Sequence, residues 1–267
     1  MLQPTPASIV VTGGKRMKLP RSRRLVLDVL HYSRKLGGIP QARNCNIADV
    51  SELRRQTTPR IGWPVLFMKA FALVAKDNPV LRRTFMPWPW AHLYEHPVSV
   101  GRMTVTRHYR GEDWVFFAQF VEPESHSLAQ IQAQVEQIKS APVESIDIFR
   151  QQYIFSAFPT PLRRLAWWAT MFLSGQKRIH RLGTFGMTTV SSRGGISLHP
   201  PSLYTSMLAF GPVGDDGSVH VTLVYDHRVL DGLEIAGCLA QLEDTLNGPI
   251  ADELRAMRDH ASGSPSS

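Results

Sequence analysis

The segment 218–247 constrains the fold of this chain more than any other, because a strand, a tight turn and a helix follow one another directly. Apolar and polar side chains alternate in its first part, SVHVTLVY, which is typical of a strand with one buried face. The turn then places His227 at the strand end and Asp231 four residues later. Gly232 would allow a close backbone approach where the helix begins. We therefore predict a histidine held at a strand terminus, with a carboxylate supporting the turn.

Helical and strand-like segments alternate along the rest of the chain, without an internal repeat or a clear linker. The spacing of apolar residues predicts helices over 21–36 and 127–141, and a buried helix over 63–79 that is apolar nearly all round. The segments 96–110 and 113–122 are strand-like and suit an antiparallel pair. This order of elements predicts one α+β domain with mixed strands.

Composition places the chain among globular proteins, since 43% of its 267 residues are hydrophobic and 19% are charged. The net charge of +8 comes from the first 60 residues, where twelve Lys and Arg face three Asp and Glu. The densest cluster, KRMKLPRSRR at 15–24, is either a solvated arm or a binding segment for an anionic partner, such as anionic lipid, an acidic carrier protein or a phosphorylated cofactor. No aromatic residues are interleaved and no zinc or RNA-binding motif follows, so we expect no nucleic-acid binding.

Cysteine usage and hydropathy indicate the compartment. Cys45 and Cys238 are the only cysteines and form no CxxC motif, so we expect small buried thiols in a reducing compartment, the cytoplasm. We expect neither a signal peptide nor a transmembrane helix, because no run of about 18 apolar residues occurs. No metal site is expected. We assign residues 1–17 to an N-terminal arm, 18–260 to the folded domain and 261–267 to a disordered tail.

An aromatic and basic helix is predicted over 161–174, with Thr160 as its cap, Pro161 as its first residue and Gly175 at its end. It would span about 21 Å at 1.5 Å per residue, short of the roughly 30 Å of a bilayer core. Its cationic and tryptophan side chains indicate a helix that lies on a membrane surface or frames an acyl-chain channel. Ordinary helix packing, with tryptophan filling the core, is the alternative.

The string YDHRVLDG at 225–232 resembles the HxxxDG signature of the chloramphenicol acetyltransferase-like superfamily. The closest resemblance is to the catalytic domain of the dihydrolipoamide acyltransferases of 2-oxoacid dehydrogenase complexes. GTFGMTTVSSRGG at 183–195 resembles the hydroxyl-rich strand of that domain, and the helices predicted upstream follow in the family's order, so that the likeness covers about 18–248. It implies a two-layer α+β sandwich with a mixed sheet flanked by helices.

The resemblance also implies roles for individual residues. His227 would be the general base that takes a proton from a thiol or hydroxyl as it attacks an acyl thioester. Asp231 would be structural and paired with an arginine of the first helix, either Arg23 or Arg24. Gly232 would support the same turn.

The hydroxyl that stabilises the tetrahedral oxyanion aligns with Thr188, or with Thr189 if the register slips by one residue. In the family the active site lies between the subunits of a homotrimer, so this hydroxyl would face His227 of a neighbouring subunit. Further assembly of trimers into larger cores is left open.

The substrate is expected to differ from that of the family. No lipoyl-bearing domain or subunit-binding module accompanies the catalytic segment, and the bulky EDWVFFAQF at 112–120 replaces the family's GLVVP-like strand. We therefore expect a stand-alone acyltransferase without a bound cofactor, whose donor is acyl-CoA or an acyl carrier protein. The alternative is a catalytically silent trimeric scaffold or acyl-binding protein of the same fold.

Overall fold

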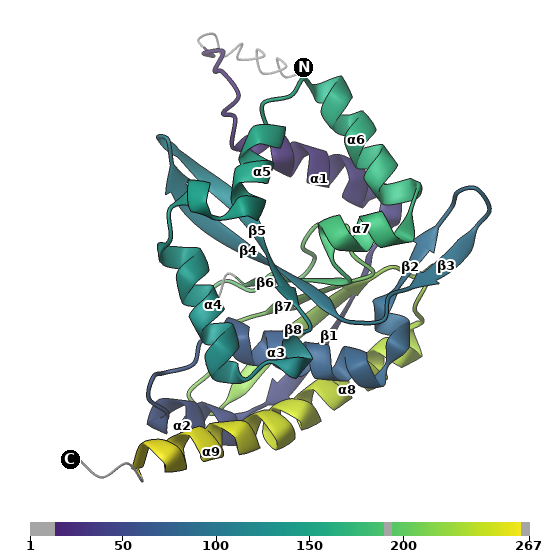
Figure 1. The fold of residues 1–267 in the computed structure, drawn as a ribbon. Coiled ribbons are helices and arrows are strands. Elements are labelled where there is room, and N and C mark those ends of the chain that lie inside the picture. The colour runs from purple at the N-terminus through teal and green to yellow at the C-terminus, as the bar shows by residue number, and fades with distance from the viewer. Residues whose placement is uncertain (1–13, 190–193, 263–267) are drawn as a thin grey trace, which may run out of the picture.

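Helices and strands alternate through most of the chain in this computed structural model, which describes residues 14–189 and 194–262 (Figure 1). The helices are α1 (Arg23–Leu36), α2 (Ala48–Gln56), α3 (Trp63–Asp77), α4 (Leu128–Ser140), α5 (Asp147–Phe155), α6 (Thr160–Phe172), α7 (Gly175–Leu182), α8 (Gly232–Thr245) and α9 (Ala251–Ser262). The strands are β1 (Ile39–Asn46), β2 (Arg83–Met86), β3 (His92–Glu95), β4 (Val100–Tyr109), β5 (Glu112–Val121), β6 (Phe185–Thr189), β7 (Ser206–Phe210) and β8 (Ser218–Tyr225).

Six strands form one mixed sheet in the order β1-β8-β7-β6-β4-β5. Strand β6 runs parallel to its neighbours β4 and β7, whereas the other adjacent strands are antiparallel. The turn between β4 and β5 is Arg110-Gly111, whose positive φ angles of 51° and 78° suit the twist of a two-residue hairpin. The predicted α+β class and the predicted strand pair are confirmed. The sequence pattern did not predict the separate hairpin of β2 and β3.

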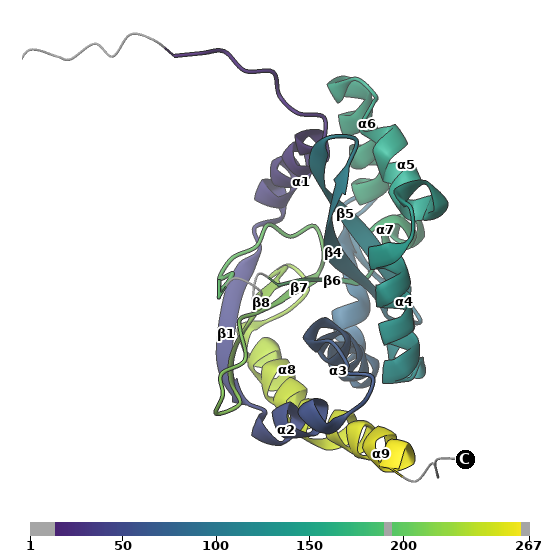
Figure 2. The ribbon, with the colours of Figure 1, turned by 90° about the vertical axis from the view of Figure 1, so that its left-hand side faces the viewer.

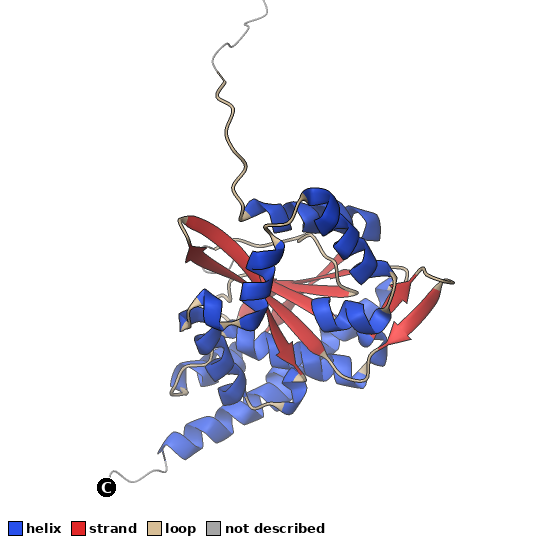
Figure 3. Ribbon diagram, turned by 45° about the horizontal axis from the view of Figure 1, so that its top comes forward, coloured by secondary structure: helices blue, strands red, loops and turns tan. Residues whose placement is uncertain are grey.

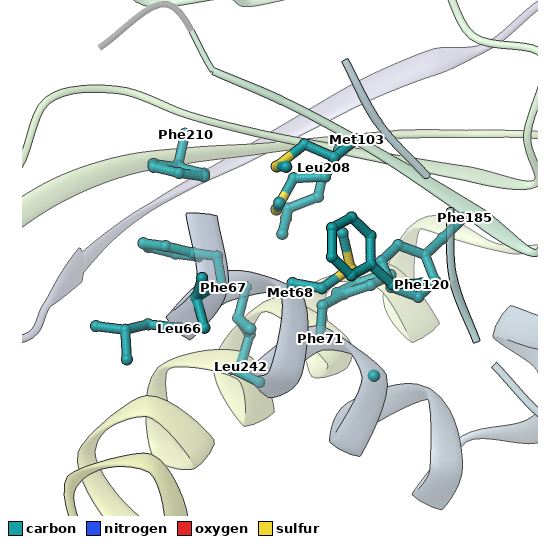
Figure 4. Close-up of a cluster of buried hydrophobic side chains, with 14 of the residues drawn as sticks. Leu66, Phe67, Met68, Phe71, Met103, Phe120, Phe185, Leu208, Phe210 and Leu242 are labelled. Atoms are coloured by element: carbon teal, nitrogen blue, oxygen red, sulfur yellow. The ribbon is translucent and has the colours of Figure 1, made fainter. Parts of the chain in front are cut away.

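The main hydrophobic core lies between one face of the sheet and helix α3 (Figure 4). Phe67 of α3 stacks on Phe210 of β7 with 4.1 Å between ring centroids, and Phe71 meets the ring of Phe185 edge-on. Because α3 is apolar nearly all round, it can be buried between the sheet and α8, as predicted. Alternation along the strands therefore leaves Arg102, Thr104, Gly186 and Thr188 on the opposite face.

A second, smaller layer covers part of that opposite face, so that the sheet lies between two groups of helices (Figure 3). Figure 2 shows α1, α5, α6 and α7 gathered at one end of the molecule, away from α3 and α8. Side chains of α1, α6 and α7 form an apolar cluster around Tyr32 and Met171, separate from the main core, whereas Phe149 of α5 belongs to the main core. A buried ion pair joins α1 to α6, with the Nε atom of Arg163 2.7 Å from an oxygen of Asp28.

The predicted cysteine environment is confirmed, since both thiols are free and buried. Burial raises the pKa of the Cys45 thiol and of the Cys238 thiol to about 11, because the thiolate is poorly solvated in the interior. Each thiol is therefore protonated at neutral pH.

Three predicted boundaries are wrong. Thr160 is the first residue of α6 rather than its cap, and it follows Pro159. Gly175 begins α7 instead of ending α6, because the hydroxyl of Ser174 accepts a hydrogen bond from the third residue of the next helix. The C-terminal tail was predicted to start at residue 261, but α9 continues to Ser262. Residues 1–13 of the predicted arm and 263–267 of the tail lie outside the described residues.

Gly183 has a φ of +87°, a backbone conformation that residues with a side chain rarely adopt. A Cβ at Gly183 would lie 2.5 Å from the carbonyl oxygen of Val100, which is backbone and cannot move aside. We expect Gly183→Ala to lower the free energy of unfolding by about 1–3 kcal/mol, measured by urea denaturation. Gly237→Ala is the matched control: its Cβ meets no atom within 4 Å and it lies inside α8, so we expect equal or greater stability. Equal stability of both variants would contradict this.

Candidate active site

The turn after β8 is built on the carboxylate and carbonyl of Asp226, which is 2% exposed. Its carbonyl accepts hydrogen bonds from the N–H groups of Val229 and Leu230, and its N–H donates to the Thr205 carbonyl of the neighbouring strand. Its carboxylate binds Arg228 through two hydrogen bonds of 2.8 and 2.6 Å. Sequence reasoning missed both residues, although they flank the histidine in YDHR. They fix the backbone on either side of His227.

The imidazole of His227 is oriented by the same turn. Its Nδ1 lies 2.8 Å from the carbonyl oxygen of Leu230 and 3.5 Å from an oxygen of Asp231. A carbonyl can only accept a hydrogen bond, so Nδ1 carries the proton and Nε2 of the neutral ring keeps its lone pair. The side chain is 50% exposed, which leaves it accessible to a substrate. Within the described residues, the turn contacts the ring's polar atoms through Nδ1.

Asp231 begins helix α8 and forms a capping box with Glu234, whose carboxylate accepts a 2.8 Å hydrogen bond from the Asp231 N–H. The expected pairing with an N-terminal arginine is not found in the described chain. Arg24 instead donates to the carbonyl of Ser156, and Arg23 is exposed. Both residues begin α1, whereas the turn adjoins the other end of that helix through the pairing of β1 with β8.

The expected close approach at Gly232 is also not found within this chain. A Cβ there would stand 3.5 Å from the hydroxyl of Tyr225 and 3.6 Å from Gln41, which are ordinary van der Waals distances. No backbone atom is among its three nearest neighbours within 4 Å. The turn therefore does not require glycine for packing inside one subunit.

Thr188 lies on the outer face of β6, and its hydroxyl is 3.1 Å from the hydroxyl of Thr104 on β4. Either oxygen can donate, so one hydroxyl can donate within the pair while the other accepts that hydrogen bond and directs its own O–H group outward. The side chain of the alternative residue, Thr189, lies outside the described part of the structure.

The structure does not bring His227 and Thr188 together within one chain. Thr188 is in register with Ala209 of β7, and Ala209 is in register with Thr222 of β8. His227 follows five residues after Thr222. With about 3.4 Å per residue along a strand and about 4.8 Å between strands, the two side chains are on the order of 15–20 Å apart. Sheet geometry therefore prevents them from acting on one carbonyl inside a single subunit.

The basic segment divides into two parts. Lys15, Arg16 and Lys18 are exposed, whereas Arg21 packs against α5. The Arg21 guanidinium lies 4.0 Å from the centre of the Tyr153 ring and donates hydrogen bonds to the Tyr153 carbonyl and the Ser156 hydroxyl. Arg21 thus has a structural role.

The two tryptophans of α6 point in different directions. Trp167 packs against Tyr32 and Phe155, whereas Trp168 is 44% exposed. The neighbouring Leu162 and Leu165 are more exposed than Trp168. Among the helices of residues 14–189 and 194–262, none is long and apolar enough to cross a bilayer. Nor do the described side chains include a group of three or more His, Cys, Asp or Glu placed to hold a metal ion.

Comparison with known proteins places this site in a recurring fold. No family model and no curated protein matches the chain. Among solved structures, the dihydrolipoamide acetyltransferase of Azotobacter vinelandii superposes with a TM-score of 0.63 at 17% identity, covering 96% of this chain and 99% of that one. A truncated catalytic core of the 2-oxoacid dehydrogenase multienzyme complex from Thermoplasma acidophilum gives 0.64 at 13% identity, covering 88% and 99%. A chloramphenicol acetyltransferase gives 0.50 at 11% identity, covering 82% and 94%.

In the Azotobacter protein, a serine, a histidine and an asparagine were studied for their role in the catalytic mechanism, the last two being four positions apart. His227 and Asp231 have the same spacing, with aspartate in the second position. At these identities the likeness shows the fold, and it extends over nearly the whole chain.

Proposed function

Because the chain has the chloramphenicol acetyltransferase-like fold, we propose that it is an acyltransferase in which His227 is the general base. The observation that carries this proposal is the orientation of His227. Its Nδ1 proton is held by the Leu230 carbonyl, which leaves Nε2 free to accept a proton. The solved neighbours that share the fold include a dihydrolipoamide acetyltransferase and a chloramphenicol acetyltransferase.

The proposed reaction transfers an acyl group between two thiols, or from a thiol to a hydroxyl. Nε2 of His227 takes the proton of the acceptor S–H or O–H while the acceptor atom bonds to the thioester carbonyl carbon. The Thr188 hydroxyl donates a hydrogen bond to the resulting oxyanion, while its oxygen accepts a hydrogen bond from the Thr104 hydroxyl. The bond to the donor sulfur then breaks, and the departing thiolate takes the proton back from the imidazolium.

We propose that the complete site forms between subunits of a homotrimer. The separation of His227 from Thr188 along the sheet supports this, because both groups are needed at one carbonyl. The Thermoplasma neighbour is described as the catalytic core of a multienzyme complex. In the proposed trimer, Asp231 and Gly232 lie at the subunit boundary, where an arginine or a close backbone approach can come from the neighbouring copy.

For the donor we propose a free thioester, either acyl-CoA or an acyl carrier protein, acting in a reducing compartment. The exposed Lys15, Arg16 and Lys18 supply positive charge for the phosphates of coenzyme A or an acidic carrier surface. The exposed apolar side chains of α6, including Trp168, are consistent with peripheral contact with a membrane surface.

The competing function is a trimeric scaffold or acyl-binding protein that retains the fold without turnover. Such a protein needs neither a free Nε2 on His227 nor a hydroxyl pair on β4 and β6. Thiol release from acyl-CoAs is therefore expected for the acyltransferase and not for the scaffold. The acceptor in this assay is dihydrolipoamide, and the donors range from acetyl- to palmitoyl-CoA.

Removing the oxyanion donor is expected to slow this reaction strongly. Thr188→Ala should lower kcat by about 10²–10³-fold, because one preorganised hydrogen bond to the oxyanion is lost. Thr188→Ser is the matched control, since it keeps the hydroxyl and should retain most of the activity. If Thr188→Ala and wild type release thiol at the same rate, Thr188 is not the oxyanion donor.

A further inference from the structure

The sheet face that carries Thr188 also bounds a large cavity under the second helical layer. The cavity has a volume of about 700 Å³ and lies between the sheet and helices α1, α5, α6 and α7. Figure 1 shows these helices arranged around this end of the molecule. Packing defects in protein interiors are rarely larger than a water molecule, whereas ligand pockets typically measure about 300–1,000 Å³. The cavity therefore has the size of a binding site.

Most of the cavity wall is apolar. Its apolar residues include Leu25 and Val29 of α1, Phe155 of α5, and Ala166 and Trp167 of α6. Because the apolar part of the wall is larger than the polar part, an apolar chain can bury much of its surface here, which favours binding of a hydrocarbon over binding of a sugar or nucleotide. With about 30 Å³ per methylene, close to the liquid volume of a water molecule, a chain of about 8–16 carbons needs roughly 240–480 Å³.

Two polar residues of the cavity wall lie close along the sheet to the proposed oxyanion site. Arg102 of β4 is in register with Gly186 of β6, and Tyr204 covers Gly186 so closely that a Cβ would lie 2.4 Å from its ring. Both Arg102 and Tyr204 line the cavity. Thr104 and Thr188 follow two residues further along the same two strands, on the same face, at about 7 Å. A chain lying in the cavity can thus place its first carbons beside the hydroxyl pair.

Arg102 gives this part of the cavity wall a positive charge. It donates hydrogen bonds to the carbonyls of His180 and Arg181, but its buried Nε has no hydrogen-bond partner among the described residues. It also has no acidic partner within ion-pair distance in the described chain. Burial lowers the pKa of Arg102 to about 10, so that the guanidinium is still charged at neutral pH. Arg102 thus adds positive charge to the cavity about two residues along the strand from the hydroxyl pair.

We propose that the cavity binds the acyl chain of the donor and selects medium- to long-chain acyl thioesters, with the thioester carbonyl next to Thr188. This inference rests on the proposed acyl-transfer function and adds its substrate class. The walls come largely from α5, α6 and α7, so the residues 147–182 set the chain length. Each buried methylene is worth roughly fourfold in binding, which makes chain length the quantity to measure.

Two variants that narrow the cavity from opposite walls test the proposal. Ala166→Trp projects from α6, Val29→Phe projects from α1, and Ala129→Trp on the exposed face of α4 is the matched control. Thermal unfolding identifies any variant that does not fold, and the other narrowing variant then carries the test. Two quantities are measured: the Kd of the fluorescent fatty acid 11-(dansylamino)undecanoate, and the ratio of kcat/KM for octanoyl- and palmitoyl-CoA to that for acetyl-CoA.

For the wild type and Ala129→Trp, we expect the probe to bind and the longer donors to exceed acetyl-CoA in kcat/KM by at least about tenfold. In Ala166→Trp and Val29→Phe, two quantities should fall by at least about tenfold: the kcat/KM for the longer donors relative to acetyl-CoA, and the affinity for the fluorescent fatty acid. Thr188→Ala should bind the probe normally while its turnover falls.

The remaining outcomes separate the two proposals. Turnover of acetyl-CoA with no preference for longer chains, unchanged by narrowing, would overturn the acyl-chain pocket and leave the acyltransferase proposal standing. Failure of the wild type to bind the probe would also overturn the pocket. Probe binding that depends on Ala166, together with no turnover of any acyl-CoA, would support the pocket and overturn the acyltransferase function.

Discussion

Replacing His227 with alanine is expected to lower kcat for thiol release from acyl-CoA by about 10²–10⁴-fold, with a smaller effect on KM. The Leu230 carbonyl holds the Nδ1 proton, so Nε2 is the one basic nitrogen that the turn presents to a substrate. Without it, water must accept the proton of the attacking thiol, and the departing thiolate has no imidazolium from which to recover one. Steady-state kinetics with a saturating acceptor measures the effect.

His108→Ala is the control for this measurement. His108 lies at the exposed end of the β4–β5 hairpin, where it pairs with Asp113, far from the proposed chemistry in the chain topology. We expect its kcat to equal that of the wild type. Equal thiol-release rates in His227→Ala and the wild type would favour the scaffold function.

Mixing two inactive variants distinguishes a site between subunits from a site within one. Subunits carrying His227→Ala are coexpressed with subunits carrying Thr188→Ala, with a different affinity tag on each, and mixed oligomers are purified through both tags. If the site is shared, the purified mixed trimers regain about one third of wild-type sites, because one of the three interfaces in every 2:1 trimer combines both intact residues. Activity that stays at the level of the separate variants would contradict the proposed arrangement.

The largest expected loss of stability comes from breaking the buried pair of Asp28 and Arg163. These side chains are 1% and 3% exposed and share two hydrogen bonds, and Arg163 also donates to the Phe158 carbonyl. Arg163→Leu would leave the Asp28 carboxylate buried without its partner. We expect the free energy of unfolding to fall by about 3–5 kcal/mol, measured by urea denaturation.

Two further variants define the origin of that loss. Asp28→Leu combined with Arg163→Leu removes both charges, and we expect it to recover most of the stability, because apolar groups can replace a buried pair. Arg150→Leu breaks the exposed pair with Asp147 and should change stability by less than about 1 kcal/mol. If Arg163→Leu is no more destabilising than Arg150→Leu, the buried pair does not hold α1 to α6.

Local pattern was enough to predict the parts of the fold that depend on local physics. Helix α3 follows from its continuous apolar surface. The alternation in β8 and the abrupt change to a helix predicted where His227 would lie. In these segments the buried face and the end signals lie within a few residues of one another.

The helices α5 and α7 were missed because their boundaries depend on neighbours. Helix α7 begins only because Ser174 caps it, and its buried Arg178 donates to the carbonyls of Phe85, Met171 and Leu203, which are distant in sequence. No periodicity within eight residues indicates such a set of partners. The same is true of Asp226, whose burial beside Arg228 is visible only in the folded turn.

The sequence by itself determined the class of fold and the strand that carries His227, because alternation and turn chemistry are local properties of the chain, whereas Thr188 was indicated by the family resemblance alone. Only the tertiary structure decided three further points: the tautomer of His227, the distance between His227 and Thr188, and the presence of the cavity next to the sheet. Each depends on segments far apart in sequence that pack together. A carbonyl three residues on fixes the proton of His227, the strand order separates it from Thr188, and four helices enclose the space that Arg102 lines.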